Sequence, residues 1–128
     1  MATPTIESRR RRRFILLSSD DALAASLRAA RPEGWEMTIA ADVDALGGFE
    51  EILQHRFLLL DLDDAAFDPL ATTAHLRRDL MLNIAIVCFG GSKELRDAAR
   101  LARADRFFER TGAVERMRQF CTQYDWGA

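Results

Sequence analysis

Short apolar runs alternate with segments of helical periodicity along almost the whole chain, and this alternation limits the fold more than any other feature. The runs lie at 14–18, 35–40, 57–60, 84–89 and 106–109. Segments with apolar residues at helical spacing follow them, at 20–31, 43–54, 70–80, 92–103 and 112–124. Strict strand–helix alternation requires crossover connections, which predict an α/β fold with a parallel sheet and helices on both of its faces.

The run at 57–60 and the run at 84–89 are almost continuously apolar, which is typical of central strands buried on both sides. The run at 35–40 alternates apolar and polar residues and therefore fits a position near an edge. In open sheets of this kind, functional residues follow the carboxyl ends of the strands. The residues directly after each run are therefore the ones to inspect.

Composition narrows the class of protein further. The chain has 128 residues, 48% of them hydrophobic and 30% charged, which predicts one globular domain. A net charge of −2 gives no reason to expect nucleic acid or a membrane as the partner. The two cysteines, Cys88 and Cys121, are too few for a disulfide scaffold and favour a reducing, cytoplasmic setting.

We expect residues 1–12 to form a disordered basic lead and residues 13–126 to form the domain. The arginine run at 9–13 is either a solvated tag or a weak contact to an anionic surface. No apolar run has the length needed to span a bilayer.

Acidic residues gather after the first and third apolar runs. Asp20 and Asp21 follow the first run, and Asp61, Asp63 and Asp64 follow the third. Carboxylates held close together raise each other's pKa or recruit a cation, and Mg²⁺ prefers oxygen ligands of this kind. The acidic clusters therefore predict a site at one edge of the sheet.

Each carboxylate also has an ordinary structural explanation. Asp20 or Asp21 could cap the helix that follows, and Asp63, Asp64 and Asp68 could lie in a solvated loop. Their occurrence on two neighbouring strands favours a site over these separate roles.

The pattern resembles the receiver domain of bacterial two-component response regulators over residues 13–124. The resemblance is carried by residues 14–21, 57–61, 84–88 and 107–110. It implies a flavodoxin-like, doubly wound, five-stranded parallel sheet in the order 2-1-3-4-5. In that family an acidic pair follows the first strand and a phosphoacceptor Asp ends the third. A Thr or Ser ends the fourth strand, and Lys-Pro follows the fifth.

By this resemblance, Asp61 is the phosphoacceptor because it directly ends the apolar run. Asp20, with Ser19 or Asp21, stands at the acidic pair, and the helical register favours Ser19 and Asp20, which would mean that one carboxylate is lost. The backbone carbonyl of Asp63 is the implied third metal ligand, so the candidate metal ligands are Asp20, Asp21, Asp61 and Asp63. The implied cofactor is a weakly bound Mg²⁺.

The sequence departs from the family pattern at the Thr/Ser, Lys and Pro positions, and the loop after Asp61 has Ala65 in the region of the family's usual proline. Cys88 stands at the Thr/Ser position and is a poor hydrogen-bond donor. Arg110 stands at the Lys position and is followed by Thr111 rather than Pro. The only lysine is Lys93, so no shift of register restores the family lysine. Arginine keeps the charge but is longer and planar. We therefore expect an atypical, degenerate receiver in which phosphorylation is slow or absent.

The implied function is that of a single-domain receiver in phosphorelay signal transduction. Its partners would be a histidine kinase or phosphotransfer protein and a downstream protein, and its only chemistry would be phosphorylation and dephosphorylation of Asp61. The fourth helix, fifth strand and fifth helix could form a docking or homodimer face, with Phe107, Phe120, Tyr124 and Trp126 as candidates. Phe107 and Phe120 fit the core better than the surface.

Two other classes stay open. The stretch at 58–63 is similar to the first motif of haloacid-dehalogenase-type phosphatases, with Asp61 as nucleophile and Asp63 as general acid, although that motif normally opens its fold. A non-catalytic flavodoxin-like binding domain would use Gly90-Gly91-Ser92 as a weak anion-binding turn. His55 and His75 lack cysteine partners at zinc-ligand spacing.

Overall fold

The computed structural model describes residues 11–125. In chain order the elements are β1 (Arg12–Leu17), α2 (Asp21–Ala30), β2 (Trp35–Ala40), a 3-10 turn (Val43–Leu46), α3 (Phe49–Ile52), β3 (Phe57–Asp61), α4 (Pro69–Ala74), a π-helical turn (His75–Asp79), β4 (Ala85–Phe89), α5 (Lys93–Leu101), β5 (Arg106–Phe108), a 3-10 turn (Arg110–Gly112) and α6 (Ala113–Gln123).

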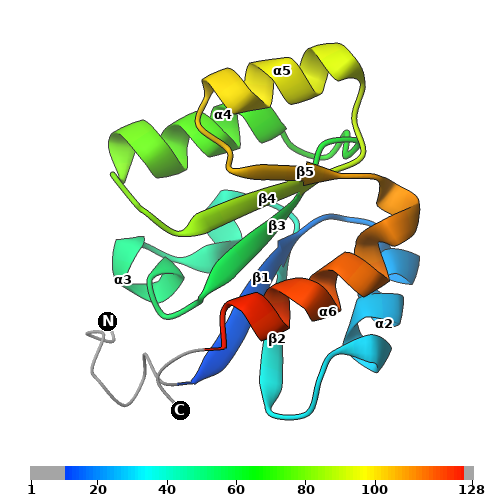
Figure 1. The fold of residues 1–128 in the computed structure, drawn as a ribbon. Helices are drawn as coiled ribbons and strands as arrows, with labels where there is room; N and C mark the ends of the chain where they lie inside the picture. The colour runs from blue at the N-terminus through cyan, green and yellow to red at the C-terminus, as the bar shows by residue number, and fades with distance from the viewer. Residues whose placement is uncertain (1–10, 126–128) are drawn as a thin grey trace.

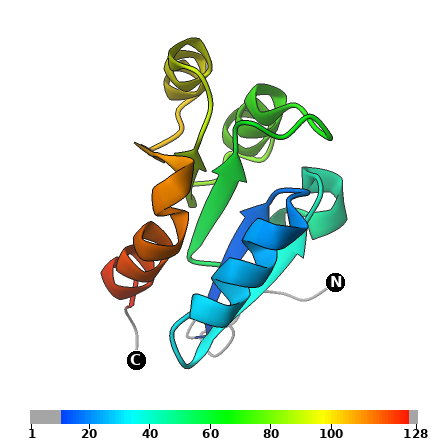
Figure 2. The same ribbon diagram turned by 90° about the vertical axis from the view of Figure 1, so that its right-hand side faces the viewer.

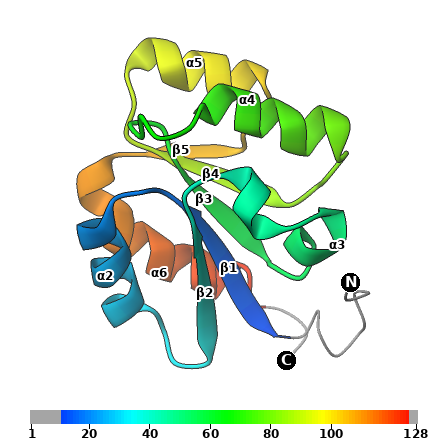
Figure 3. The ribbon, with the colours of Figure 1, turned by 180° about the vertical axis from the view of Figure 1, so that it is seen from behind.

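The strands form one five-stranded parallel sheet in the order β2-β1-β3-β4-β5, as predicted (Figure 1). Helices α2 and α6 pack on one face, and α3, α4 and α5 pack on the other. Figures 2 and 3 show the same arrangement from the side and from behind. The doubly wound α/β architecture is therefore confirmed.

The core has two layers because successive strand residues point to opposite faces of the sheet. Leu58 and Leu60 of β3 pack toward α3, α4 and α5, whereas Phe57 and Leu59 pack toward α2 and α6. All four side chains are fully buried. The ring of Phe57 stacks on that of Phe14 at 5.0 Å between centroids, which ties β1 to β3 on the α2 side.

The segment predicted as one helix over 43–54 is broken in the structure. A 3-10 turn covers Val43–Leu46, and only four residues, Phe49–Ile52, are α-helical. Gly47, between them, has φ +84°, which interrupts a right-handed helix. The segment at 70–80 also changes character, because α4 passes into a π-helical turn at His75.

The first strand begins at Arg12, earlier than the apolar run predicts. Arg11 and Arg13 pair with Glu36 of β2, at 2.7 and 2.9 Å, and Arg12 pairs with Asp125 at 2.6 Å. This part of the arginine run belongs to the domain rather than to a separate lead.

The expectations for residues 1–10 and for Trp126 lie outside the described residues. Between residues 11 and 125, no helix is long and apolar enough to cross a membrane.

Candidate functional site

Asp61 is the last residue of β3 and is 1% exposed. Strand β1 lies on one side of it, with Leu17 paired to Leu60, and β4 lies on the other, with Phe89 paired to Asp61 itself. Because the strands are parallel, their carboxyl ends meet at one edge. The residues that follow β1, β3, β4 and β5 therefore surround this carboxylate; we call this place the crevice.

Each carboxylate oxygen of Asp61 accepts two hydrogen bonds. Oδ2 accepts from the hydroxyl of Ser18 at 2.7 Å and from Nη2 of Arg110 at 3.1 Å. Oδ1 accepts from the backbone N–H of Asp63 at 2.9 Å and from Nη1 of Arg110 at 2.7 Å. A buried charge is tolerated only when it is paired and hydrogen-bonded in this way. The crevice thus holds Asp61 as a fully partnered carboxylate.

Arg110 brings three carboxylates together. Besides Asp61, its Nη2 donates to Oδ2 of Asp20, and its Nη1 lies 3.4 Å from Oδ2 of Asp63. The guanidinium lies 5.3 Å from the ring centroid of Phe89, a cation–π contact. The hydrogen bond with Asp61 raises the pKa of Arg110 although burial opposes this, so the side chain stays charged.

Asp20 has a structural and a crevice role at the same time. Its Oδ1 caps α2 by accepting from the backbone N–H of Leu23 at 3.0 Å, and its Oδ2 faces Arg110. The hydrogen bond from Leu23 and then the one from Arg110 lower the pKa of Asp20. Asp20 therefore caps α2 and also lines the crevice.

The turn after β4 is filled by a carboxylate from the chain itself. Gly91 N–H donates to Oδ1 of Asp63 at 2.9 Å. Gly90 has φ +72°, and a Cβ at this position would lie 2.0 Å from Oδ2 of Asp63. The two glycines thus allow the loop after β3 to approach the end of β4.

The structure does not bring two of the candidate residues into the crevice. Asp21 is the first residue of α2 and is exposed. Cys88 is fully buried in the core on the α3, α4 and α5 side, and burial raises the pKa of its thiol to about 12. The residue level with Asp61 on β4 is Phe89, so the structure does not place the side chain of Cys88 beside Asp61. A shift of one residue along a strand moves a side chain to the opposite face.

Sequence reasoning did not single out Ser18 at this edge, and it placed Asp64 in the acidic cluster without predicting its contacts. Ser18, 3% exposed, donates to Asp61. Asp64 accepts from the hydroxyl of Ser19 at 2.9 Å and from its backbone N–H. Burial alone would raise the pKa of Asp64, but hydrogen bonds from Ser19 and Ala66 lower it. The signal for Ser18 was its place directly after β1, next to the strand that carries Asp61.

Within residues 11–125, no group of three or more His, Cys, Asp or Glu side chains is arranged to hold a metal ion. The guanidinium of Arg110 lies between Asp20 and Asp61, the two carboxylates that would have to share a cation. The oxygen donors are of the type that Mg²⁺ prefers, but their present arrangement serves a guanidinium instead.

No family model and no curated protein matches the chain. Solved structures do match. The receiver domain of the TMAO respiratory system response regulator TorR has a TM-score of 0.70 and 19% identity, over 89% of this chain and 99% of that one. The signal receiver domain of a DNA-binding response regulator from Colwellia psychrerythraea 34H has a TM-score of 0.66 and 15% identity, over 88% and 99%. The receiver domain of a sensor histidine kinase from Pseudomonas aeruginosa PAO1, with a magnesium ion in its active-site cleft, has a TM-score of 0.65 and 13% identity, over 89% and 97%. The chain has the receiver-domain fold.

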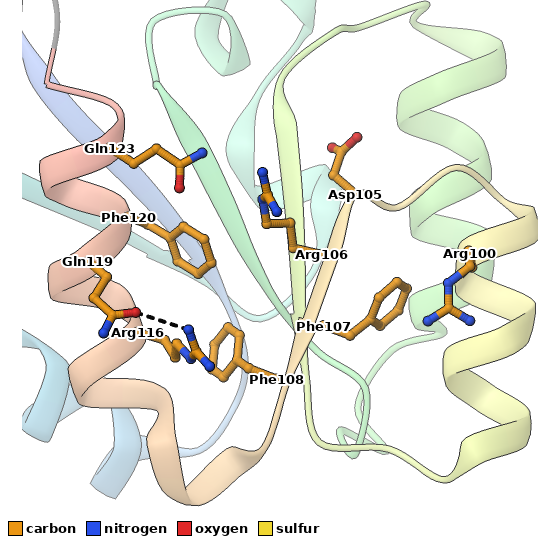
Figure 4. Close-up of a pocket in the computed structure, with 9 residues that line it drawn as sticks. All are labelled: Arg100, Asp105, Arg106, Phe107, Phe108, Arg116, Gln119, Phe120 and Gln123. Carbon is orange, nitrogen blue, oxygen red and sulfur yellow. Dashed lines mark hydrogen bonds between the residues drawn. The ribbon is translucent and has the colours of Figure 1, made fainter.

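A groove lies away from the crevice, along the outer edge of β5 between α5 and α6 (Figure 4). Its volume is about 440 Å³. The guanidinium of Arg100 covers the partly buried ring of Phe107 at 4.7 Å on the α5 side, and Arg116 donates to Gln119 on α6. Phe120 is 7% exposed and packs in the core as expected. The groove is lined by Arg100, Asp105, Arg106, Phe107, Phe108, Arg116, Gln119, Phe120 and Gln123.

Proposed function

We propose that this protein is a receiver module of two-component signal transduction in which Asp61 is the phosphoacceptor. We propose further that it is atypical and acts mainly through protein contacts, with phosphorylation slow or absent. Slow or absent phosphorylation is supported by the hydrogen bonding of Asp61. Its two carboxylate oxygens already accept four hydrogen bonds, two of them from Arg110.

Phosphoryl transfer would require an oxygen of Asp61 to attack the phosphorus of a phosphohistidine. The new O–P bond forms as the P–N bond breaks, and the imidazole nitrogen keeps the electron pair. Donors that stabilise the free carboxylate raise the barrier unless they bind the transition state at least as well. Arg110, Ser18 and the N–H of Asp63 stabilise the free carboxylate, which supports slow transfer.

Weak Mg²⁺ binding is consistent with this crevice. Its ligands would be Asp20, Asp61 and the backbone carbonyl of Asp63, whereas Asp21 is exposed and the Asp63 side chain is held by Gly91 and Arg110. A bound Mg²⁺ would neutralise charge on the acceptor and on the incoming phosphoryl oxygens. Arg110 competes for the same carboxylates, which explains why the binding would be weak.

The expected partners are a histidine kinase or phosphotransfer protein and a downstream protein, all in the cytoplasm. The groove along β5 is the surface that we assign to the downstream partner or to a second copy of the chain. We expect no turnover of a separate substrate. The phosphatase alternative gains no support from the geometry, because Asp63 faces two donors and serves as a hydrogen-bond acceptor.

Incubation with acetyl phosphate and Mg²⁺, followed by intact-protein mass spectrometry, tests this function. We expect the wild-type protein to gain phosphoryl mass much more slowly than an ordinary receiver domain treated in parallel. Asp61→Asn should abolish any gain, and Asp21→Asn, which changes an exposed carboxylate, should leave it as in the wild type. Stoichiometric phosphorylation of Asp61 at the rate of the ordinary receiver would contradict the atypical assignment.

A further inference from the structure

We infer that Arg110 is the built-in cation of the crevice, and that its guanidinium holds the place from which a divalent ion would bridge Asp20 and Asp61. The inference rests on the proposed role of this crevice as a receiver site. The inference adds two statements to that role. The side chain of Arg110 masks a divalent-cation site, and removal of this side chain makes the site accessible to a cation.

The charges around Arg110 support the inference. Asp20, Asp61 and Asp63 bring three carboxylates within 3.4 Å or less of one guanidinium. Asp61 is 1% exposed, so water cannot replace the cation that neutralises it. Without Arg110, three carboxylates would face each other with no cation between them. Such a cluster either takes up protons or recruits a metal ion.

The shape of the side chain explains why an arginine can serve here. Its planar fork bonds both oxygens of Asp61 through Nη1 and Nη2, and the same Nη2 reaches Asp20. The ring of Phe89 supports the guanidinium from one side at 5.3 Å. Phe89 occupies the position level with Asp61 on β4. The strand-end residues of β1, β3, β4 and β5 thus all contribute to one arginine site.

Mg²⁺ and Arg110 must therefore exclude each other, because both need the same oxygens of Asp20 and Asp61. Calorimetric titration with MgCl₂ tests this directly, without any phosphoryl donor. We expect Arg110→Ala to bind Mg²⁺ at least about tenfold more tightly than the wild type. Adding Asp20→Asn to Arg110→Ala should remove the gain.

Arg28→Ala is the matched control, because Arg28 is an exposed arginine of α2 that lies outside both the crevice and the groove along β5. It should bind Mg²⁺ as the wild type does. Equal Mg²⁺ affinity of the wild type and Arg110→Ala would overturn the inference. This result would leave the phosphorylation of Asp61 as a separate question, because no phosphoryl group takes part in the titration.

Thermal unfolding covers the case in which Arg110→Ala folds poorly, and Arg110→Gln serves as a second variant. Mg²⁺ that binds only the folded state raises the melting temperature of the protein. The melting temperatures of both variants should therefore rise more on addition of Mg²⁺ than that of the wild type. Variants that stay unfolded even with saturating Mg²⁺ would contradict the inference, because a cation in the exposed site should restore the pairing of Asp61.

Discussion

The protonation state of a partly buried polar side chain depends on its immediate hydrogen-bond partners. His55, which lies outside the crevice, is an example. Its Nδ1 lies 3.1 Å from the carbonyl oxygen of Glu51, which places the proton on Nδ1, and its Nε2 accepts from the hydroxyl of Thr38 at 2.8 Å. Burial lowers the pKa of His55 below its ordinary value, although the carbonyl oxygens around Nδ1 oppose this. The ring is therefore held neutral.

This lowered pKa predicts a pH-dependent stability. In the unfolded chain His55 takes up a proton near its ordinary pKa of about 6.5, whereas the folded protein resists protonation. Stability should be full above this pH and should fall as the pH drops below it. Urea unfolding at about pH 7.5 and about pH 5.5 should show a smaller loss in His55→Gln than in the wild type. An equal loss in the wild type and in His55→Gln would contradict the prediction.

At the scale of elements, the turn between β4 and α5 positions a residue of the crevice, because Asp63 packs against its glycines. Gly90 is needed there because the carboxylate of Asp63 occupies the space in which a Cβ would lie. The contact fixes the loop after β3 against the end of β4, and Asp63 in turn lies beside Arg110. The glycine pair, which the sequence offered as a weak anion-binding turn, thus contacts the carboxylate of Asp63 from the same chain.

Gly90→Ala should therefore be strongly destabilising. A positive φ and a clash with Asp63 act together, and we expect a loss of about 2–4 kcal/mol in the free energy of unfolding. Gly48→Ala is the matched control, because a Cβ there would meet nothing within 4 Å and φ is −94°. It should change stability by less than about 1 kcal/mol. Urea denaturation measures both, and similar losses in the two variants would refute the role given to Gly90.

The elements also show where sequence reasoning reaches its limit. The strands were predictable because continuous apolar runs fit a buried parallel sheet. The sequence did not reveal that the side chain of Cys88 lies in the core rather than beside Asp61, because the run at 84–89 holds no polar residue to mark which side chain is level with Asp61. The helix predicted at 43–54 was wrong because Gly47 adopts a positive φ, which periodicity alone does not reveal.

At the scale of the whole molecule, the site exists because the fold joins distant parts of the chain. Arg110 and Asp20 are 90 positions apart and meet only at the carboxyl edge of the sheet. The sequence predicted the strand order by resemblance and named Asp20, Asp61 and Arg110 as candidates. It could not predict that Arg110 would bridge the two carboxylates, because the direction of that side chain depends on the 3-10 turn after β5.

A double-mutant cycle on Asp61 and Arg110 tests most directly whether these two side chains form the centre of the crevice. The cycle compares the free energies of unfolding of the wild type, Asp61→Asn, Arg110→Gln and the double variant, all measured in urea without metal. A buried, bidentate ion pair predicts a coupling of at least about 1.5 kcal/mol between the two substitutions. Additivity to within about 0.5 kcal/mol would mean that the two residues do not interact in the folded protein, and it would contradict the account.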